Sequence, residues 1–256
     1  MIAGLYQRLP KYGWIPDLPD QRDYPYSLLA PKISTLPEKI DLRPNCSPIE
    51  DQGALGSCTA QALVGNLEFL KVKKLKKLLN FSRLFLYYNE RLIRKTTATD
   101  SGASLRDGIK TLVKAGDCLE ELCPYNIDKF TTRPNAKAYH NALLYQILGY
   151  YRLGSTLEMK HTLSLGCPFV FGFAVYDSFE SAGVSKTGIV PMPQKDERMI
   201  GGHAVMAVGY EENKQVFIVR NSWGKSWGDH GYCYMPYAYL QSQSLSSDFW
   251  TIRDME

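Results

Sequence analysis

Apolar residues recur at steps of three and four through the first half of the chain, a pattern that predicts helices. The clearest run starts at Cys58. Its apolar positions are Ala60, Leu63, Val64, Leu67 and Leu70. Further helices are expected near residues 82–92 and 105–115. The second of these should end at Gly116, since glycine commonly follows a helix end.

The second half of the chain has a different pattern. Residues 169–175, 203–210 and 216–220 are apolar, β-branched or aromatic runs between glycine or proline breaks, which predicts strands. A helix is expected near residues 157–165. A mainly helical front half followed by a strand-rich back half predicts the α+β class.

Residues 1–35 follow neither pattern. Four prolines interrupt the first 30 of them and charged residues alternate with apolar ones, so we expect an extended segment on the surface. No charged start precedes an apolar run, which gives no secretory signal. The longest apolar stretch, residues 167–176, is about half the length needed to cross a bilayer. We expect no membrane partner. The location would be cytoplasmic, or reached by export without a cleaved signal or after removal of a leader.

Composition excludes some classes of function. A chain of 256 residues with 45% hydrophobic and 22% charged residues is typical of a globular protein with its own core. A net charge of +4 is too small to indicate a nucleic-acid partner. The basic run at residues 71–77 lies near a predicted helix end, where cations are favourable in any case. We expect a monomer that binds no nucleic acid.

The six cysteines are dispersed, and six is few for a disulfide scaffold of this length. If one is a catalytic thiol, five remain and cannot all pair internally, so we expect several buried thiols. Cys118 and Cys123 have the spacing of half a metal site or of a local disulfide. Because no second half is visible, we expect no metal and no cofactor.

The segment at residues 52–60 reads QGALGSCTA and delivers Cys58 to the first turn of the predicted helix. The positive end of the helix dipole favours a thiolate there, and a thiolate is the nucleophile of acyl transfer. The free backbone N–H of Cys58 and the side-chain amide of Gln52 are two donors that an oxyanion would need.

Two later segments supply partners for this thiol. The first, GGHAVMAVGY at residues 201–210, places His203 at the start of a strand, where it can exchange a proton with the thiol. The second, NSWGKSWGDHGY at residues 221–232, places Asn221 after another strand. An asparagine amide can accept from the second histidine N–H and select its tautomer. Trp223 would screen that hydrogen bond from water.

These three segments resemble the papain family of cysteine peptidases, in a divergent form of bacterial type. His203 follows Cys58 by 203 − 58 = 145 positions, within the spacing that this family shows. The resemblance implies Cys58 as nucleophile, His203 as acid and base, Asn221 as its orienting group and Gln52 as oxyanion donor. It covers residues 36–256. It implies two lobes, a helical one over residues 42–145 and a β-barrel-like one over residues 146–256, with a substrate cleft between them.

The chain also departs from the family pattern. Leu55 stands where many members have a disulfide cysteine, and Thr59 replaces the usual aromatic residue after the nucleophile. Gly202 stands before the histidine in place of Asn or Asp. We expect Gly102, Gly202 and Trp223 to bind substrate, although the segment around Gly102 matches the family only loosely.

Three questions stay open on the sequence alone. The expected reaction is hydrolysis of a peptide bond in a protein or peptide substrate through a thioester. A thiol acyltransferase would use the same residues, and a catalytically silent scaffold would keep the same fold. Residues 1–35 are either a short pro-segment that blocks the cleft or a strap packed on the back of the domain.

Overall fold

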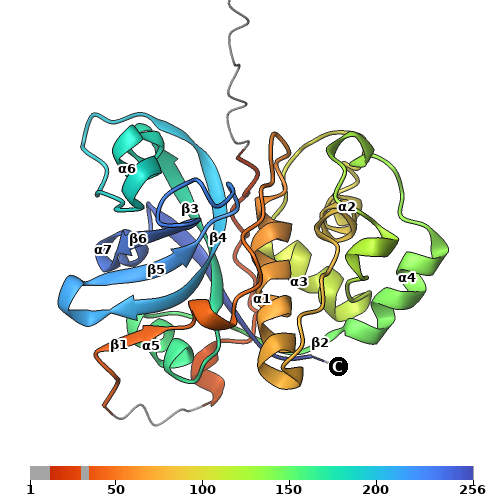
Figure 1. The fold of residues 1–256 in the computed structure, drawn as a ribbon, viewed down its shortest axis with the longest axis horizontal. Coiled ribbons are helices and arrows are strands. Elements are labelled where there is room, and N and C mark those ends of the chain that lie inside the picture. Colours follow the sequence, from red (N-terminus) through yellow and green to blue (C-terminus); the bar gives the residue numbers. More distant parts are fainter. Residues whose placement is uncertain (1–11, 30–34, 256) are drawn as a thin grey trace, which may run out of the picture.

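The computed structural model describes residues 12–29 and 35–255. Its helices are α1 (Cys58–Leu75), α2 (Arg83–Ile93), α3 (Leu105–Lys114), α4 (Ala136–Ala142), α5 (Thr156–Ser164), α6 (Ala182–Thr187) and α7 (Tyr237–Gln241). Its strands are β1 (Lys39–Asp41), β2 (Ile147–Arg152), β3 (Phe169–Tyr176), β4 (Met199–Glu211), β5 (Val216–Arg220), β6 (Tyr232–Pro236) and β7 (Ser246–Met255). Figure 1 shows α1 to α4 gathered on one side and most of the sheet on the other.

The predicted helices near residues 58, 82, 105 and 157 and the strands at residues 169 and 216 are confirmed. Local chemistry explains several of their ends. Ser82 and Ser104 cap α2 and α3, each accepting a backbone N–H three residues further on. Gly116 follows α3 with a φ of +71°, a conformation that suits glycine.

Helix α1 differs from the one-sided helix that the spacing predicted. Every residue from Cys58 to Lys71 is buried, because α2 and α3 cover one side of α1 and β4 covers the other. Two of its buried polar residues have partners inside the protein. The Glu68 carboxylate pairs with the Arg83 guanidinium at 2.8 Å, and the Asn66 amide donates to the carbonyl of Pro168 at 3.2 Å.

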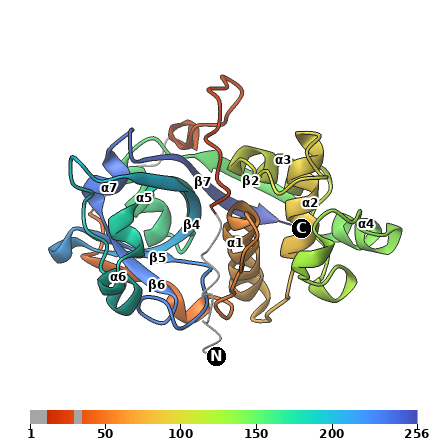
Figure 2. The ribbon, with the colours of Figure 1, turned by 90° about the horizontal axis from the view of Figure 1, so that it is seen from above.

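The strands form one antiparallel sheet in the order β2-β7-β3-β4-β5-β6, with β1 paired to β4. The expected α+β fold with two lobes is confirmed. Among the described strands the sheet is open, with β2 and β6 at its edges, and it does not close into a barrel. Figure 2 shows β7 crossing from the sheet lobe toward the helices, where it meets β2.

Residues 12–29, which we call the strap, run between the two lobes (Figure 1). An isolated bridge joins Trp14 to Ala103 before α3, and another joins Pro25 to Arg152 of β2. Tyr26 is fully buried and its hydroxyl lies 3.0 Å from Nδ1 of His161 in α5. The strap is therefore part of the core and touches both lobes. In the described part of the chain, no helix is long and apolar enough to cross a bilayer.

Candidate active site

Cys58 is the first residue of α1 and its side chain is fully buried. A tight turn precedes it, in which the Ser57 N–H donates to the carbonyl of Leu55 at 2.8 Å. The backbone N–H groups of the first helical turn have no partner inside the helix and point toward this end. The local sequence therefore places the thiol where a negative charge is stabilised.

His203 lies inside β4, not at the start of a strand as expected. The strand begins at Met199, because Gly201 and Gly202 pair with Val175 and Ala174 of β3. Antiparallel pairing of Met206 with Arg220 then brings Asn221, the residue after β5, beside His203. The Nε2 atom of His203 lies 2.8 Å from Oδ1 of Asn221.

This hydrogen bond selects one form of the imidazole. Oδ1 of Asn221 accepts, and it also accepts the backbone N–H of Ser222 at 2.8 Å, which holds the amide in this orientation. Nε2 of His203 is therefore the protonated nitrogen in the neutral ring. Nδ1 is buried and has no hydrogen-bond partner among the described residues.

Trp223 covers the imidazole. Its ring centroid lies 4.9 Å from that of His203, at an interplanar angle of 31°. Tyr12 of the strap approaches the same imidazole edge-on at 6.2 Å. His203 is consequently shut off from solvent on both sides, as the sequence predicted for Trp223 and did not predict for Tyr12.

Burial keeps Cys58 and His203 neutral. It raises the pKa of the Cys58 thiol to about 12, against smaller opposing effects from backbone groups of Ala204 and Gly13. It also lowers the pKa of His203 to about 4, although the hydrogen bond to Asn221 favours the charged ring. These contacts place the sulfur beside Ala204, the neighbour of His203. With the strap in place, both groups are uncharged at pH 7.

Gln52 is fully buried and is tied to the segment that carries Asn221. Its Nε2 donates to the carbonyl of Leu55 at 2.9 Å, and its Oε1 accepts the hydroxyl of Ser222 at 2.6 Å. Tyr125 donates to the Gln52 carbonyl at 2.9 Å. Ser222 therefore contacts both Gln52 and Asn221, a role that the sequence analysis missed although Ser222 lies in the motif it used.

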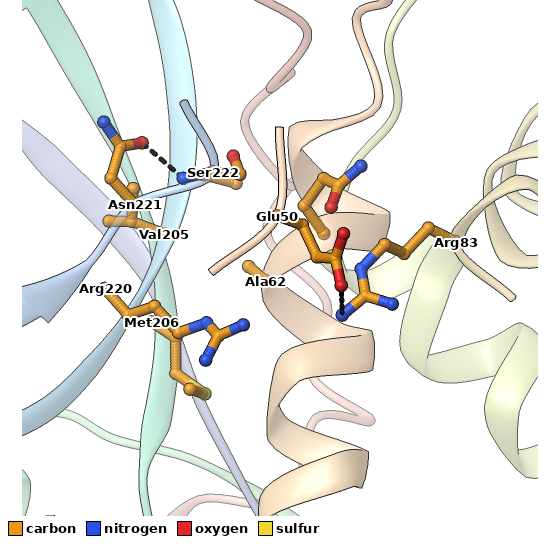
Figure 3. Close-up of a pocket in the computed structure, with 10 residues that line it drawn as sticks. Glu50, Ala62, Arg83, Val205, Met206, Arg220, Asn221 and Ser222 are labelled. Carbon is orange, nitrogen blue, oxygen red and sulfur yellow. Dashed lines mark hydrogen bonds and ion pairs between the residues drawn. The ribbon is translucent and has the colours of Figure 1, made fainter. Parts of the chain in front are cut away.

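A small polar cavity lies behind these residues, between α1 and β4. Figure 3 shows Asn221 and Ser222 on its sheet side, with Glu50, Ala62 and Arg83 on its helical side. Among residues 12–29 and 35–255, no cluster of three His, Cys, Asp or Glu side chains suits a metal ion. All six cysteines are free. Thr59, which follows Cys58, donates its hydroxyl to the buried carboxylate of Glu90 at 2.7 Å.

Gly102 and Gly202 face each other across the strap. The Trp14 N–H donates to the carbonyl of Gly202 at 3.0 Å. On the other side, Ala103 donates to the carbonyl of Gly13 at 2.8 Å and accepts the N–H of Ile15 at 2.9 Å. A Cβ on Gly102 would lie 2.2 Å from the Gly13 oxygen, so only glycine permits this approach.

The first residues of the strap thus lie along the candidate catalytic residues. Tyr12 packs against Trp223 with ring centroids 6.0 Å apart and ring planes at 59°, and its hydroxyl donates to the Glu180 carboxylate. Gly13 lies against Gly56, where a Cβ would come within 1.9 Å of the Gly56 carbonyl oxygen beside Cys58. Residues 12–14 occupy the space in front of Cys58 and His203.

Comparison with known proteins agrees with this arrangement. The family model described as papain family cysteine protease matches residues 36–248. The chain belongs to the papain family of cysteine proteases. It is a cysteine-type peptidase, and its substrates are proteins or peptides.

Two similar proteins align over nearly the whole chain. An uncharacterized peptidase C1-like protein of Acanthamoeba polyphaga mimivirus is 41% identical over 95% of this chain and 87% of its own. The crystal structure of xylellain, a cysteine protease from Xylella fastidiosa, is 39% identical over 96% of both chains, with a TM-score of 0.88. The thiol protease aleurain of Arabidopsis thaliana is 30% identical, and this chain spans 55% of its length.

Acid should destabilise this peptidase through His203. A ring with a pKa of about 4 in the folded state and an ordinary value of 6.5 when unfolded binds fewer protons when folded. The contribution of His203 to the free energy of unfolding is complete above pH 6.5 and is lost as the pH falls toward 4. At pH 4 the loss is about 3 kcal/mol.

Urea unfolding of the protein and of His203→Asn at pH 7 and pH 4 measures this effect. The unsubstituted protein should lose about 3 kcal/mol more than the variant. Burial is the main reason why the pKa of Asp248 is raised to about 6, so acid changes the free energy of unfolding through Asp248 in the opposite direction. Both proteins contain Asp248, so this effect cancels when they are compared. His140→Asn, at an exposed position, is the control and should behave as the unsubstituted protein. Equal losses in all three proteins would contradict the prediction.

Proposed function

We propose that Cys58 is the nucleophile of this peptidase, that His203 is its acid and base, and that Asn221 and Gln52 complete the catalytic set. The observation that carries the proposal is the 2.8 Å bond from Nε2 of His203 to Asn221. It leaves Nδ1 as the basic nitrogen, on a strand whose next residue, Ala204, touches the Cys58 sulfur.

In the proposed reaction, Nδ1 of His203 takes the thiol proton and the Cys58 thiolate attacks the carbonyl carbon of the scissile bond. The resulting oxyanion is stabilised by the N–H of Cys58 and the amide of Gln52. When the carbon–nitrogen bond breaks, His203 returns the proton to the leaving amine and a thioester remains. Water, deprotonated by His203, then hydrolyses the thioester and restores the thiol.

Ser222 supports this set as a positioning residue. Its hydroxyl donates to Oε1 of Gln52, which directs the Nε2 end of that side chain toward Leu55 and the start of α1. Its backbone N–H donates to Asn221. One residue therefore fixes the orientation of the oxyanion donor and of the group that selects the histidine tautomer.

We further propose that the strap inhibits the enzyme by occupying the substrate site. The contacts of Tyr12, Gly13 and Trp14 with the catalytic wall support this role. A substrate carbonyl must reach the Cys58 sulfur, and the backbone of Gly13 is already there. Displacing the strap would admit water and substrate, and would let the thiol and the imidazole form the ion pair that a reactive cysteine needs.

Labelling with an epoxysuccinyl thiol-protease inhibitor, followed by intact-mass analysis, tests the nucleophile. The full chain should gain one adduct slowly, and Trp14→Ala, which weakens the strap, should gain it faster. Cys58→Ala should gain none in either background. Cys167→Ala, which removes a buried thiol next to Lys73, is the matched control and should label as the parent does.

Two outcomes would overturn the proposal. An adduct that persists in Cys58→Ala would assign the nucleophile elsewhere. No adduct in any folded form, including Trp14→Ala, would indicate a catalytically silent scaffold.

A further inference from the structure

The indole of Trp14 lies in a slot formed by three neighbouring strands. A Cβ on Gly172 of β3 would lie 1.8 Å from the Trp14 ring, so the ring rests directly on the Gly172 backbone. A Cβ on Gly202 of β4 would lie 2.9 Å from the same ring. The ring N–H donates to Oδ2 of Asp248 in β7 at 3.2 Å. The absence of two side chains thus leaves room for a large planar group, with one acceptor at its edge.

An irregularity in the sheet aims Asp248 into this slot. Val170 pairs with Trp250, and Gly172 pairs with Ser247. Between these two pairs β3 advances by two residues (172 − 170), whereas β7 advances by three (250 − 247). The extra residue forms a bulge, which turns a side chain out of the ladder. Asp248 has a φ of +59° and is 2% exposed. The strained backbone of Asp248 and the contact of its buried carboxylate with an indole indicate that this residue has a role in binding.

Arg152 balances the charge of Asp248 once the strap, which carries Asp17 and Asp23, has left. Oδ1 of Asp248 accepts from Arg152 at 3.0 Å, while Oδ2 takes the Trp14 ring N–H and the backbone N–H of Asp17 at 2.8 Å. When the strap leaves, Oδ2 loses both donors and Arg152 stays. The slot then needs a neutral hydrogen-bond donor more than it needs a second cation.

The strap also shows how a peptide lies in this place. The backbone of residues 13–15 is extended and bonded to Ala103 on one wall and to Gly202 on the other. Those backbone groups are free to bind any extended peptide once the strap has left. A substrate that runs in the direction opposite to the strap would seat one residue at Cys58, in the place of Gly13, and would bring the side chain of its preceding residue into the slot, where Trp14 lies.

We infer that this slot selects tryptophan in the substrate, as the residue that precedes the one seated at Cys58. This inference rests on the proposed role of Cys58. Leucine would leave the slot partly empty, and phenylalanine would leave Oδ2 of Asp248 buried without a donor. An unpaired buried acceptor lowers binding by a factor of about 10 to 100.

The test uses the full chain carrying Trp14→Ala and fluorogenic amides of the form X-Gly, in which only X varies. We expect kcat/KM to be highest for tryptophan and about 10- to 100-fold lower for phenylalanine, leucine and arginine. Benzothienylalanine has the shape of tryptophan with sulfur in place of the ring N–H. It should lose about 10-fold or more relative to tryptophan, which isolates the hydrogen bond to Asp248.

Gly172, on which the Trp14 ring rests, gives a second test. Its substitution should have two effects, one a gain of activity and the other a loss of specificity. Gly172→Ala in the otherwise unsubstituted chain should displace the Trp14 ring and raise cleavage of an X-Gly amide in which X is alanine, a side chain small enough for the filled slot. The same variant should no longer prefer tryptophan. A folding defect cannot produce both changes. Gly149→Ala, in β2, where a Cβ meets only ordinary contacts at 3.8 Å, is the matched control and should change neither.

Failure of this inference is distinguishable from failure of the proposed function. Cleavage that depends on Cys58 but does not discriminate among the substrates, or a tryptophan preference that survives Gly172→Ala, would overturn the slot and leave the nucleophile in place. No cleavage together with no inhibitor adduct would overturn the proposed function itself.

Discussion

Replacing Trp14 with alanine should raise the peptidase activity of the full chain by about 30-fold. The substitution removes the indole from its slot and the hydrogen bond to Asp248, but leaves the proposed catalytic residues unchanged. Truncation of a fully buried aromatic residue costs about 3 to 5 kcal/mol. Trp14 is half-buried, so we expect about 2 kcal/mol, which is a shift of about 30-fold toward the open state.

Initial rates on an internally quenched peptide measure this effect. The rate of epoxysuccinyl labelling should rise by the same factor, since both rates depend on the fraction of open molecules. Leu18→Ala is the control, because Leu18 belongs to the strap but is 80% exposed. If Trp14→Ala left both rates unchanged, the strap would not limit access to Cys58. A point substitution is preferable to deletion of the strap, which would uncover Trp250 and remove the buried Tyr26 from the core.

In that open background, His203→Ala should lower kcat by about 10³- to 10⁴-fold. The variant has no base to deprotonate Cys58 and no acid to protonate the leaving amine, and general acid–base catalysis is worth about 10²- to 10⁴-fold. Loss of the imidazolium also leaves a thiolate without its cation, so we expect the upper end of this range. KM should change much less, because His203 acts on the reacting bond.

The pH profile separates a catalytic role from a structural one. Rates of the parent should rise and fall with the ionisation of the thiol and imidazole, whereas the residual rate of His203→Ala should follow the thiol alone and increase steadily with pH. His161→Ala, which removes the partner of Tyr26, is the control for loss of a histidine. A loss of less than tenfold in His203→Ala, in a folded protein, would contradict the proposed role.

A network of partly buried ion pairs holds the strap at Asp17 and Asp23. Asp23 pairs with Arg106 at 2.6 Å and with Arg152 at 2.8 Å. Asp17 accepts the Trp250 ring N–H at 3.0 Å. Removing one member of such a network leaves an uncompensated charge, which is costly. The network therefore anchors the part of the strap that follows Trp14, while the cleft contacts themselves come from residues 12–15.

Asp248 belongs both to this network and to the slot. In the closed form it binds the strap through Trp14 and Asp17. In the open form its Oδ2 would be available to a substrate. The same carboxylate would thus make the inhibitory contact and the specificity contact, so a peptide with tryptophan in the slot position competes directly with the strap.

The sequence alone was sufficient for the family, the fold class and the candidate catalytic set. Local patterns explain this: a cysteine at the start of a helix, a histidine on an apolar strand and an asparagine after another strand are all visible within short segments. Helices α1, α2, α3 and α5 were predicted because their period is a local property, whereas the short helices α4, α6 and α7 were not predicted. Strands β2, β6 and β7 were not predicted, since their residues depend on pairing partners distant in the chain.

Only the tertiary structure decided where the strap lies and what it touches. Nothing in residues 12–15 indicates a partner at Gly202 or Ala103, because those contacts arise from folding of segments up to about 190 positions away. The slot likewise depends on a bulge between β3 and β7, which no local pattern encodes. The neutrality of Cys58 and His203 has the same origin: each pKa is set mainly by burial, and burial is a property of the assembled lobes.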